Sequence, residues 1–155
     1  MNIEQVRSAV ELMVQDDANE LKSLLNNSSE LLNFQSPGGK NWLHQAANHN
    51  SPKVIEMLTA LYPIDSTDEY GRTSLSLAAI SACLPAAQRL IELGANVNHK
   101  TNRTPLSCAV YGQSKDLLKL LIENGANNET KEELIRFGRS QGYKNIEEDL
   151  NELNY

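Results

Sequence analysis

Apolar positions along the chain fall into two alternating kinds of segment. Short segments rich in alanine and leucine, such as residues 75–81, predict helices that lie close to their neighbours, because alanine has little bulk. Longer segments, such as residues 86–93, place apolar residues three and four apart, which predicts helices with one buried face. Gly94 follows directly, where a helix C-terminus favours glycine. The pattern therefore predicts pairs of one small-residue helix and one amphipathic helix.

The helix pairs repeat at a nearly constant spacing. Leu43, Leu75 and Leu106 occupy equivalent positions, 32 and 31 residues apart. The segments that carry them are GKNWLHQAANHN (39–50), GRTSLSLAAISA (71–82) and NRTPLSCAVYGQ (102–113). The amphipathic halves repeat as well, in RLIELGANVN (89–98) and KLLIENGANN (119–128). Repetition of this length predicts a stack in which each unit buries its apolar face against the next.

Turn and capping residues lie at the expected ends of these helices. Residues 68–71 (DEYG) predict a tight turn that uses the conformational freedom of the glycine. Thr73 and Thr104 are placed to cap the small-residue helices that follow them. Pro52 and Pro85 both suit the first turn of an amphipathic helix.

The flanking segments repeat the helix pattern but are more polar. Each predicts one further helix pair, and a stack of repeats needs such ends, because an uncapped end would expose an apolar face. We therefore expect a single domain (1–155) of five helix pairs. It comprises an N-terminal capping pair (1–35), three repeats (36–67, 68–98 and 99–128) and a C-terminal capping pair (129–155).

The repeated units resemble the ankyrin-repeat family. The resemblance rests on DEYGRTSLSLAA with LIELGANVN in the second unit and on NRTPLSCAV with LLIENGANN in the third, and it is specific over about residues 39–128. It implies an all-α solenoid of five antiparallel helix pairs, with short β-hairpin-like fingers and a concave groove. The family's TPLH tetrapeptide keeps its histidine only at His44. The resemblance implies that this histidine bridges neighbouring loops by hydrogen bonds.

Composition narrows the class of protein and the compartment. The chain has two Phe, five Tyr and one Trp in 155 residues, so its core must be aliphatic. The net charge of −6 argues against nucleic acid and anionic membranes as partners, because both need a cationic surface. Two cysteines cannot build a disulfide scaffold, which favours a reducing compartment. We therefore expect a cytoplasmic protein without a signal peptide or membrane span, monomeric when free.

The negative charge belongs to the ends of the chain. Residues 1–35 hold 6 acidic and 2 basic residues, and residues 129–155 hold 7 acidic and 4 basic residues. The central residues 36–128 hold 7 acidic and 8 basic residues, a net charge of +1. The acidic ends favour solubility and discourage end-to-end association, and the surface expected to bind is near neutral.

Residues that could carry catalysis are scattered. His44, His49 and His99 share no metal-binding spacing with Cys83 or Cys108. A nucleophilic cysteine would need a base and an oxyanion site, and the sequence identifies neither. We predict no catalytic, metal or cofactor site, and no enzyme activity.

Asn98 carries one modification signal. Leu90, Val97 and Asn98 together resemble the ankyrin asparagine that asparaginyl hydroxylases accept, although Asn96 stands where an acidic residue is usual. The alternative is that Asn98 simply forms hydrogen bonds within its finger.

The family resemblance also implies which residues face a partner, namely the finger tips and the groove-facing ends of the small-residue helices. Carried over by register, these are Lys40, Trp42, Asn48, His49, Glu69, Tyr70, Arg72, Ile80, Ser81, Lys100, Thr101, Arg103 and Tyr111. Trp42 either packs on the preceding helix pair or stands exposed as an anchor. Tyrosine and arginine dominate binding hot spots, and basic residues outnumber acidic ones in this set. The set predicts a mildly basic groove suited to an acidic protein segment, unless these are ordinary surface charges.

We expect a non-enzymatic protein–protein interaction module that binds another protein through its groove and fingers. One alternative is an inhibitor or immunity-type protein that occludes the active site of a toxin or enzyme, since the chain consists of repeats alone. The other is a host-directed effector. Seventeen asparagines indicate an AT-rich genome, which is compatible with both alternatives.

Overall fold

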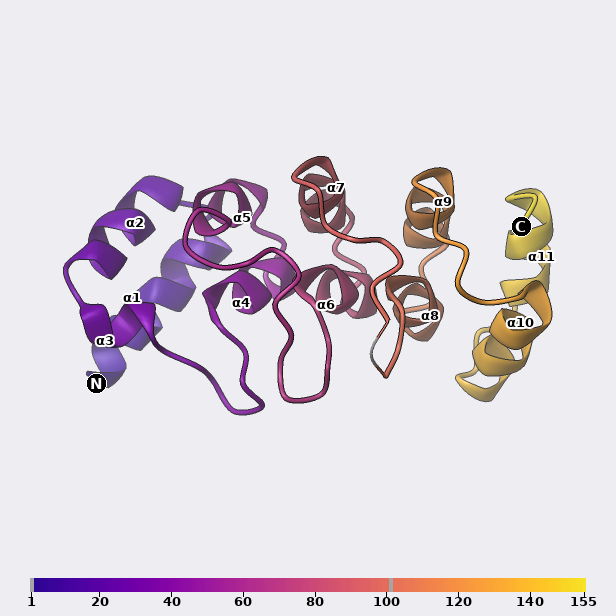
Figure 1. Cartoon of the computed structure of the whole chain (residues 1–155), viewed down its shortest axis with the longest axis horizontal. Coiled ribbons are helices and arrows are strands. Elements are labelled where there is room, and N and C mark those ends of the chain that lie inside the picture. Colours follow the sequence, from indigo (N-terminus) through magenta and orange to yellow (C-terminus); the bar gives the residue numbers. More distant parts are fainter. Residues whose placement is uncertain (1, 101) are drawn as a thin grey trace.

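The computed structural model describes residues 2–100 and 102–155, which form one elongated stack of helices (Figure 1). The helices are α1 (Ile3–Val14), α2 (Ala18–Asn26), α3 (Ser29–Leu32), α4 (Trp42–Asn48), α5 (Pro52–Leu58), α6 (Ser74–Ile80), α7 (Leu84–Glu92), α8 (Pro105–Tyr111), α9 (Lys115–Glu123), α10 (Lys131–Ser140) and α11 (Ile146–Glu152). An inner row contains α4, α6, α8 and α10, and an outer row contains α5, α7, α9 and α11 (Figure 1). Helices α1–α3 cover the N-terminal end of the stack. The predicted all-α solenoid is confirmed.

None of the helices in the described ranges is long and apolar enough to cross a membrane. The core is almost entirely aliphatic, as the composition predicted. The outer helices bury their apolar stripes against the inner row, through Val54, Ile55 and Leu58 in α5, Ala86, Ala87 and Leu90 in α7, and Leu117, Leu118 and Leu121 in α9. Each fully buried large aliphatic side chain stabilises the fold by about 1.5 to 3 kcal/mol.

Small side chains hold the inner helices together. Ala78 and Ala79 of α6 and Ala109 of α8 are fully buried. Gly112, the C-cap residue of α8, lies so close to α6 that a Cβ atom there would come within 2.5 Å of the Ala79 carbonyl oxygen. Because backbone cannot move aside easily, a side chain at this position would push α8 away from α6.

Side-chain caps begin these inner helices, at Thr73 and Thr104 as the sequence predicted and at Thr130 in addition. Thr73, Thr104 and Thr130 each accept a hydrogen bond from the backbone N–H three residues later. Pro52 and Pro85 lie in the first turns of α5 and α7. The threonines therefore cap the helices that follow them, and the prolines occupy first turns, where their missing N–H group costs no helical hydrogen bond.

The fingers are short. Isolated antiparallel bridges close the first finger between Ser36 and Lys40 and the second between Thr67 and Thr73. Gly71 has a φ of 72°, as expected for the tight turn in the second finger.

His44 joins the first repeat to the second finger. Its Nδ1 accepts a hydrogen bond from the Asn41 backbone N–H at 3.2 Å, which leaves the proton on Nε2. Nε2–H then donates to the Ser66 carbonyl at 2.9 Å. Burial lowers the pKa of His44 below its usual value, although the bond to Ser66 opposes this shift. The fold therefore uses the neutral imidazole, and the bridging role implied by the family resemblance is confirmed.

Trp42 packs on α3, a four-residue helix that was not itself predicted from the sequence. The Trp42 indole N–H donates to the Leu31 carbonyl at 2.7 Å, and the rings of Trp42 and Phe34 lie 4.7 Å apart. Trp42 is fully buried. Of the two expectations for Trp42, packing on the preceding helices is right, and its inclusion among the partner-binding residues is wrong, because no surface of it is accessible.

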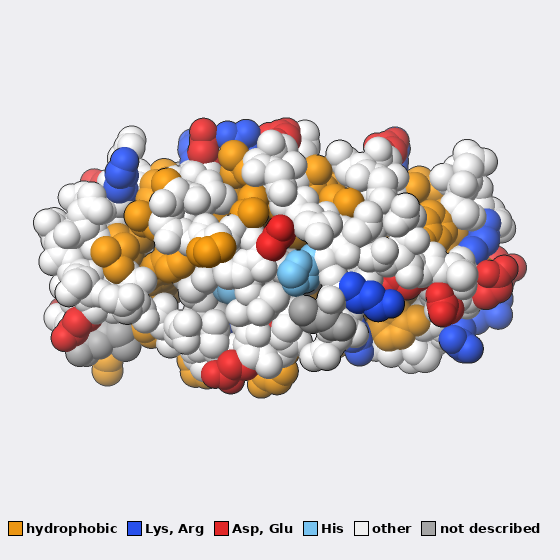
Figure 2. Space-filling model, in the orientation of Figure 1, with side chains coloured by type: hydrophobic (Ala, Val, Ile, Leu, Met, Phe, Trp, Pro, Cys, Tyr) orange, Lys and Arg blue, Asp and Glu red, His pale blue; other side chains and the backbone are white. Residues whose placement is uncertain are grey.

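A polar cluster fastens the C-terminal pair to the last repeat. The Tyr143 hydroxyl donates to Asp149 at 2.7 Å, and Lys115 Nζ lies 3.0 Å from the other oxygen of Asp149. Asp149 is only 8% exposed, so these two partners compensate its buried charge. Figure 2 shows acidic and basic side chains gathered over this end of the stack.

A further set of caps crosses from one repeat to the next. In the first four helix pairs, a residue between the two helices has a left-handed backbone, with φ values of 53° at Asp16, 56° at Asn50, 54° at Ala82 and 53° at Gln113. Asp16 Oδ1 accepts hydrogen bonds from the N–H groups of Lys53 and Val54 at the start of α5. Asn50 Oδ1 accepts one from Ala86 in α7. The N-cap residues of α5 and α7 form no side-chain cap of their own, so the preceding repeat supplies it.

Ala82 cannot form such a cap, and α9 is capped instead by its own Ser114. We predict that Asn50→Gly lowers the free energy of unfolding by about 1 kcal/mol, because α7 loses its cap while glycine adopts the left-handed backbone without strain. Asn50→Ala should cost more, because a left-handed backbone costs alanine about 1 to 2 kcal/mol, and Ala82→Asn should for the same reason raise stability by up to about 1 kcal/mol. Urea unfolding followed by circular dichroism measures all three. An Asn50→Gly variant as stable as the unchanged chain would contradict a role for the cross-repeat cap.

His44 should make stability depend on pH near neutrality. Because its folded-state pKa is lowered, the unfolded chain takes up the proton first as the pH falls, so stability is lost below about pH 6.5, the unfolded value. His44→Gln cannot titrate, and should lower stability by about 1 to 2 kcal/mol at neutral pH through the altered hydrogen bonds. Urea unfolding of both proteins between about pH 7.5 and pH 5.5 should show the gap between them narrowing. Parallel curves would show that His44 is not the titrating group.

Candidate functional site

One groove gathers five of the predicted contact residues, and we call it the central groove. It has a volume of about 390 Å³ and is lined by Tyr70, Arg72, Ile80, Asn102, Arg103 and Tyr111. Ile80 and Tyr111 are the last residues of α6 and α8, and the other four precede these helices. Sequence reasoning missed Asn102, whose Nδ2 donates to the Tyr70 carbonyl at 2.9 Å and joins the two walls.

Arg72 is neutralised by a buried carboxylate. Its Nε and Nη2 donate to Asp68 Oδ2 at 2.8 and 2.6 Å, while Asp68 Oδ1 accepts the backbone N–H groups of Tyr70 and Arg72. Burial alone would raise the pKa of Asp68, but the hydrogen bonds from Arg72 outweigh it and the pKa lies below its usual value. The Arg72 guanidinium also stacks 4.7 Å from the centre of the Tyr70 ring. Arg72 is therefore a fixed wall of the groove.

Arg103 has a different environment. Its guanidinium carbon lies 5.5 Å from the centre of the Tyr111 ring and 4.8 Å from that of Phe137. Both distances are within the range of cation–π contacts. Within the described ranges, Arg103 forms no ion pair with a carboxylate. Arg103 is also exposed. The groove therefore offers one accessible guanidinium that contacts aromatic rings and is not neutralised by a carboxylate.

The groove follows a strict register along the inner row. The residue seven positions after each inner N-cap is Asn48, Ile80, Tyr111 and then Phe137. The residue directly before each N-cap is Lys40, Arg72, Arg103 and then Glu129. Extending this register into the C-terminal pair would have identified Phe137. The same register shows that the position before the N-cap, which is basic in the three repeats, is occupied by the acidic Glu129 in the C-terminal pair.

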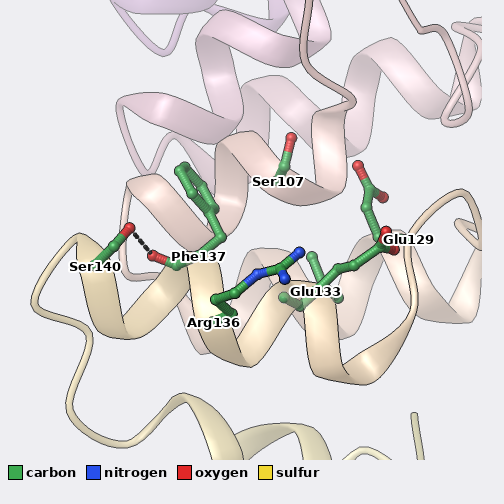
Figure 3. Close-up of a pocket in the computed structure, with 7 residues that line it drawn as sticks. Ser107, Glu129, Glu133, Arg136, Phe137 and Ser140 are labelled. Atoms are coloured by element: carbon green, nitrogen blue, oxygen red, sulfur yellow. Dashed lines mark hydrogen bonds between the residues drawn. The ribbon is translucent and has the colours of Figure 1, made fainter.

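A second hollow, which we call the cap pocket, adjoins the central groove between α8 and α10 (Figure 3). It has a volume of about 430 Å³ and is lined by Ser107, Glu129, Glu133, Leu134, Arg136, Phe137 and Ser140. Phe137 reaches from α10 toward α8 (Figure 3), so Arg103 stacks on a residue of this second pocket. Thr104 Oγ1 donates to Glu129, but burial raises the pKa of Glu129 overall.

The remaining predicted residues lie outside the central groove. Asn48 and Ser81 meet at the C-terminal ends of α4 and α6, where the Ser81 hydroxyl donates to Asn48 Oδ1 at 3.2 Å. His49 is the exposed C-cap residue of α4.

The predicted finger residues serve partly to join the fingers. Glu69 N–H donates to the Gly38 carbonyl at 2.9 Å, and the backbone of Lys40 forms the bridge that closes the first finger. Lys100 is exposed, and Thr101 lies outside the described residues.

Asn98 fastens its repeat to the following one. Its Nδ2 donates to the Gly125 carbonyl at 2.9 Å, and its Oδ1 accepts the Asn127 N–H at 3.0 Å. Both ends of the amide are therefore occupied. Only the Asn98 backbone N–H bonds locally, to Asn96 Oδ1. The expectation of bonds confined to one finger was too narrow, and hydroxylation of Asn98 stays a prediction.

The two cysteines are buried free thiols. Burial raises the pKa of Cys108 to about 11 and also raises that of Cys83. Nucleophilic cysteines have lowered pKa values, so neither thiol has that character. Within residues 2–100 and 102–155, no group of three or more His, Cys, Asp or Glu side chains is placed to hold a metal ion.

Comparison with known proteins agrees with this architecture. The family model for ankyrin repeats in three copies matches residues 7–101 and, in a second placement, residues 43–132. The chain therefore belongs to the ankyrin-repeat family. Ankyrin repeats generally mediate protein–protein interaction.

Individual relatives share a repeat stretch with this chain. The Neurogenic locus Notch protein of Drosophila melanogaster is 43% identical over 63 residues, which cover 39% of this chain and 2% of that protein. The B-cell lymphoma 3 protein homolog of Mus musculus is 33% identical over 97 residues, or 57% of this chain and 22% of that protein. The chain thus spans only a small part of these relatives.

Proposed function

We propose that this chain is a non-enzymatic interaction module that binds a segment of a partner protein in the central groove. The observation that carries the proposal is the meeting of two arginine–tyrosine pairs from consecutive repeats in one groove. Tyrosine and arginine are enriched among residues that dominate binding energy. Asp68 already orders the Arg72 side chain, and the bond from Asn102 to the Tyr70 carbonyl fixes the Tyr70 backbone, which reduces the entropy lost on binding.

An acidic segment is the partner chemistry that the groove favours. The basic positions before the inner helices, Lys40, Arg72 and Arg103, lie in consecutive repeats, and the central residues 36–128 carry a net charge of +1. The acidic ends disfavour nucleic acid and anionic membranes. We also propose a cytoplasmic protein that is monomeric when free, because two buried thiols suit a reducing compartment.

An inhibitor or immunity-type protein and a host-directed effector would both use such a groove. The class of partner separates them. A toxin or enzyme bound through its active site would identify an inhibitor, and a protein of another organism would identify an effector.

Capture of partners from the native cell, followed by affinity measurement with groove variants, tests the proposal. Tyr70→Ala/Tyr111→Ala should weaken binding of the captured partner by about 2 kcal/mol or more, as expected for hot-spot tyrosines. Val14→Ala/Leu61→Ala is a matched control, because these side chains are 63% and 44% exposed, against 59% and 47% for the tyrosines. The control should stay within about 0.5 kcal/mol. If both double variants behave alike while folded, the central groove is not the binding site.

A further inference from the structure

We propose that Arg103 is the residue of the central groove that pairs with a carboxylate of the partner, and that the floor beside it takes a large apolar side chain. The groove would then select an acidic residue next to an aromatic or branched aliphatic residue. This inference rests on the proposed function and adds the chemistry that the groove recognises.

The two groove arginines differ in whether a carboxylate of this chain neutralises their charge. The Arg72 guanidinium gives two hydrogen bonds to Asp68, a carboxylate whose residue is only 5% exposed. An incoming acid would have to compete with that buried ion pair. Arg103 lies against the rings of Tyr111 and Phe137, which orient it without neutralising it. Its guanidinium therefore retains the donors that bind a carboxylate in a bidentate manner.

An apolar subsite lies beside this charge. Ile80 is half-buried at the end of α6, between the exposed rings of Tyr70 and Tyr111. The groove volume of about 390 Å³ is at the lower end of the range for small-molecule pockets, which is enough for one large side chain. Burial of such a side chain against two tyrosines and an isoleucine would supply most of the affinity.

The cap pocket limits where the acidic residue can lie. Glu129 takes the position before the N-cap that basic residues hold in the three repeats, and Glu133 lines the same pocket. Arg136 also lines the cap pocket, but the two carboxylates outnumber it, so an anion is less favoured beyond Arg103 toward α10 than at Arg103 itself. A partner acid is therefore favoured at Arg103, with its apolar neighbour on the α6 side.

Selection from a phage-displayed library of random dodecapeptides tests this chemistry directly. Peptides enriched on the wild-type chain should carry Asp or Glu within two positions of Phe, Tyr, Trp, Leu or Ile. A synthetic, fluorescein-labelled copy of the most enriched peptide is then measured by fluorescence anisotropy. Its affinity should fall as salt concentration rises, since an exposed ion pair is screened.

Arg103→Gln and the peptide with its acid changed to the amide form a double-mutant cycle. Each single change should weaken binding about tenfold, and the second change should add little in the presence of the first. Lys119→Gln is the matched control, because Lys119 is 58% exposed on the outer helix α9, and it should leave the affinity unchanged. Asp68→Asn, if its circular dichroism is native, should strengthen binding of the acidic peptide several-fold, because it frees Arg72.

Absence of enrichment, enriched peptides without acids, or additive effects in the cycle would overturn the inference about Arg103. Such results leave the proposed function standing if Tyr70→Ala/Tyr111→Ala still weakens binding of the captured partner by about 2 kcal/mol or more. About tenfold weaker binding of both the peptide and the partner on Arg103→Gln supports the inference and the proposed function together.

Discussion

The close approach of neighbouring inner helices is the constraint on which the rest of this structure depends. Gly112 leaves no room for a side chain against the Ala79 carbonyl, and alanines fill the adjoining positions. Each repeat alone would expose this seam and its aliphatic stripe, so stability comes from neighbour contacts. Because the inner helices stack in one row, residues at equivalent positions line up from repeat to repeat.

The central groove is a product of that alignment. The register brings Arg72, Arg103 and their tyrosines side by side from separate repeats, although these side chains contribute little to the core. The buried Asp68 then neutralises Arg72, whereas the ring of Phe137 holds Arg103 without neutralising its charge. A repeating scaffold thus presents a non-repeating surface, and specificity arises from the residues that break the pattern.

Most of the fold could be predicted from the sequence, because repeat spacing, small-residue helices, glycine ends and threonine caps are local signals. Five groove residues could be predicted because the family resemblance implies which positions face a partner, and the register carries those positions over to this chain. The cross-repeat caps of Asp16 and Asn50 could not, since their partners lie more than 30 residues away in sequence. Burial of Trp42 was left open because it depends on α3, a helix of four residues with little periodicity to detect. The contact of Phe137 with Arg103 was not predicted, because the C-terminal helix pair was interpreted only as a polar cap and the repeat register was not extended into it.

Chemical-shift mapping on the isotopically labelled chain tests whether the central groove is the binding surface. Amide and side-chain spectra would be recorded with and without a captured partner segment. We expect the largest changes to cluster at the central groove, including the Ile80 methyl groups and the Arg103 side chain, and the signals of the outer helices α5, α7 and α9 to change little. Changes concentrated on the outer helices, with the groove signals unmoved, would contradict binding in the central groove.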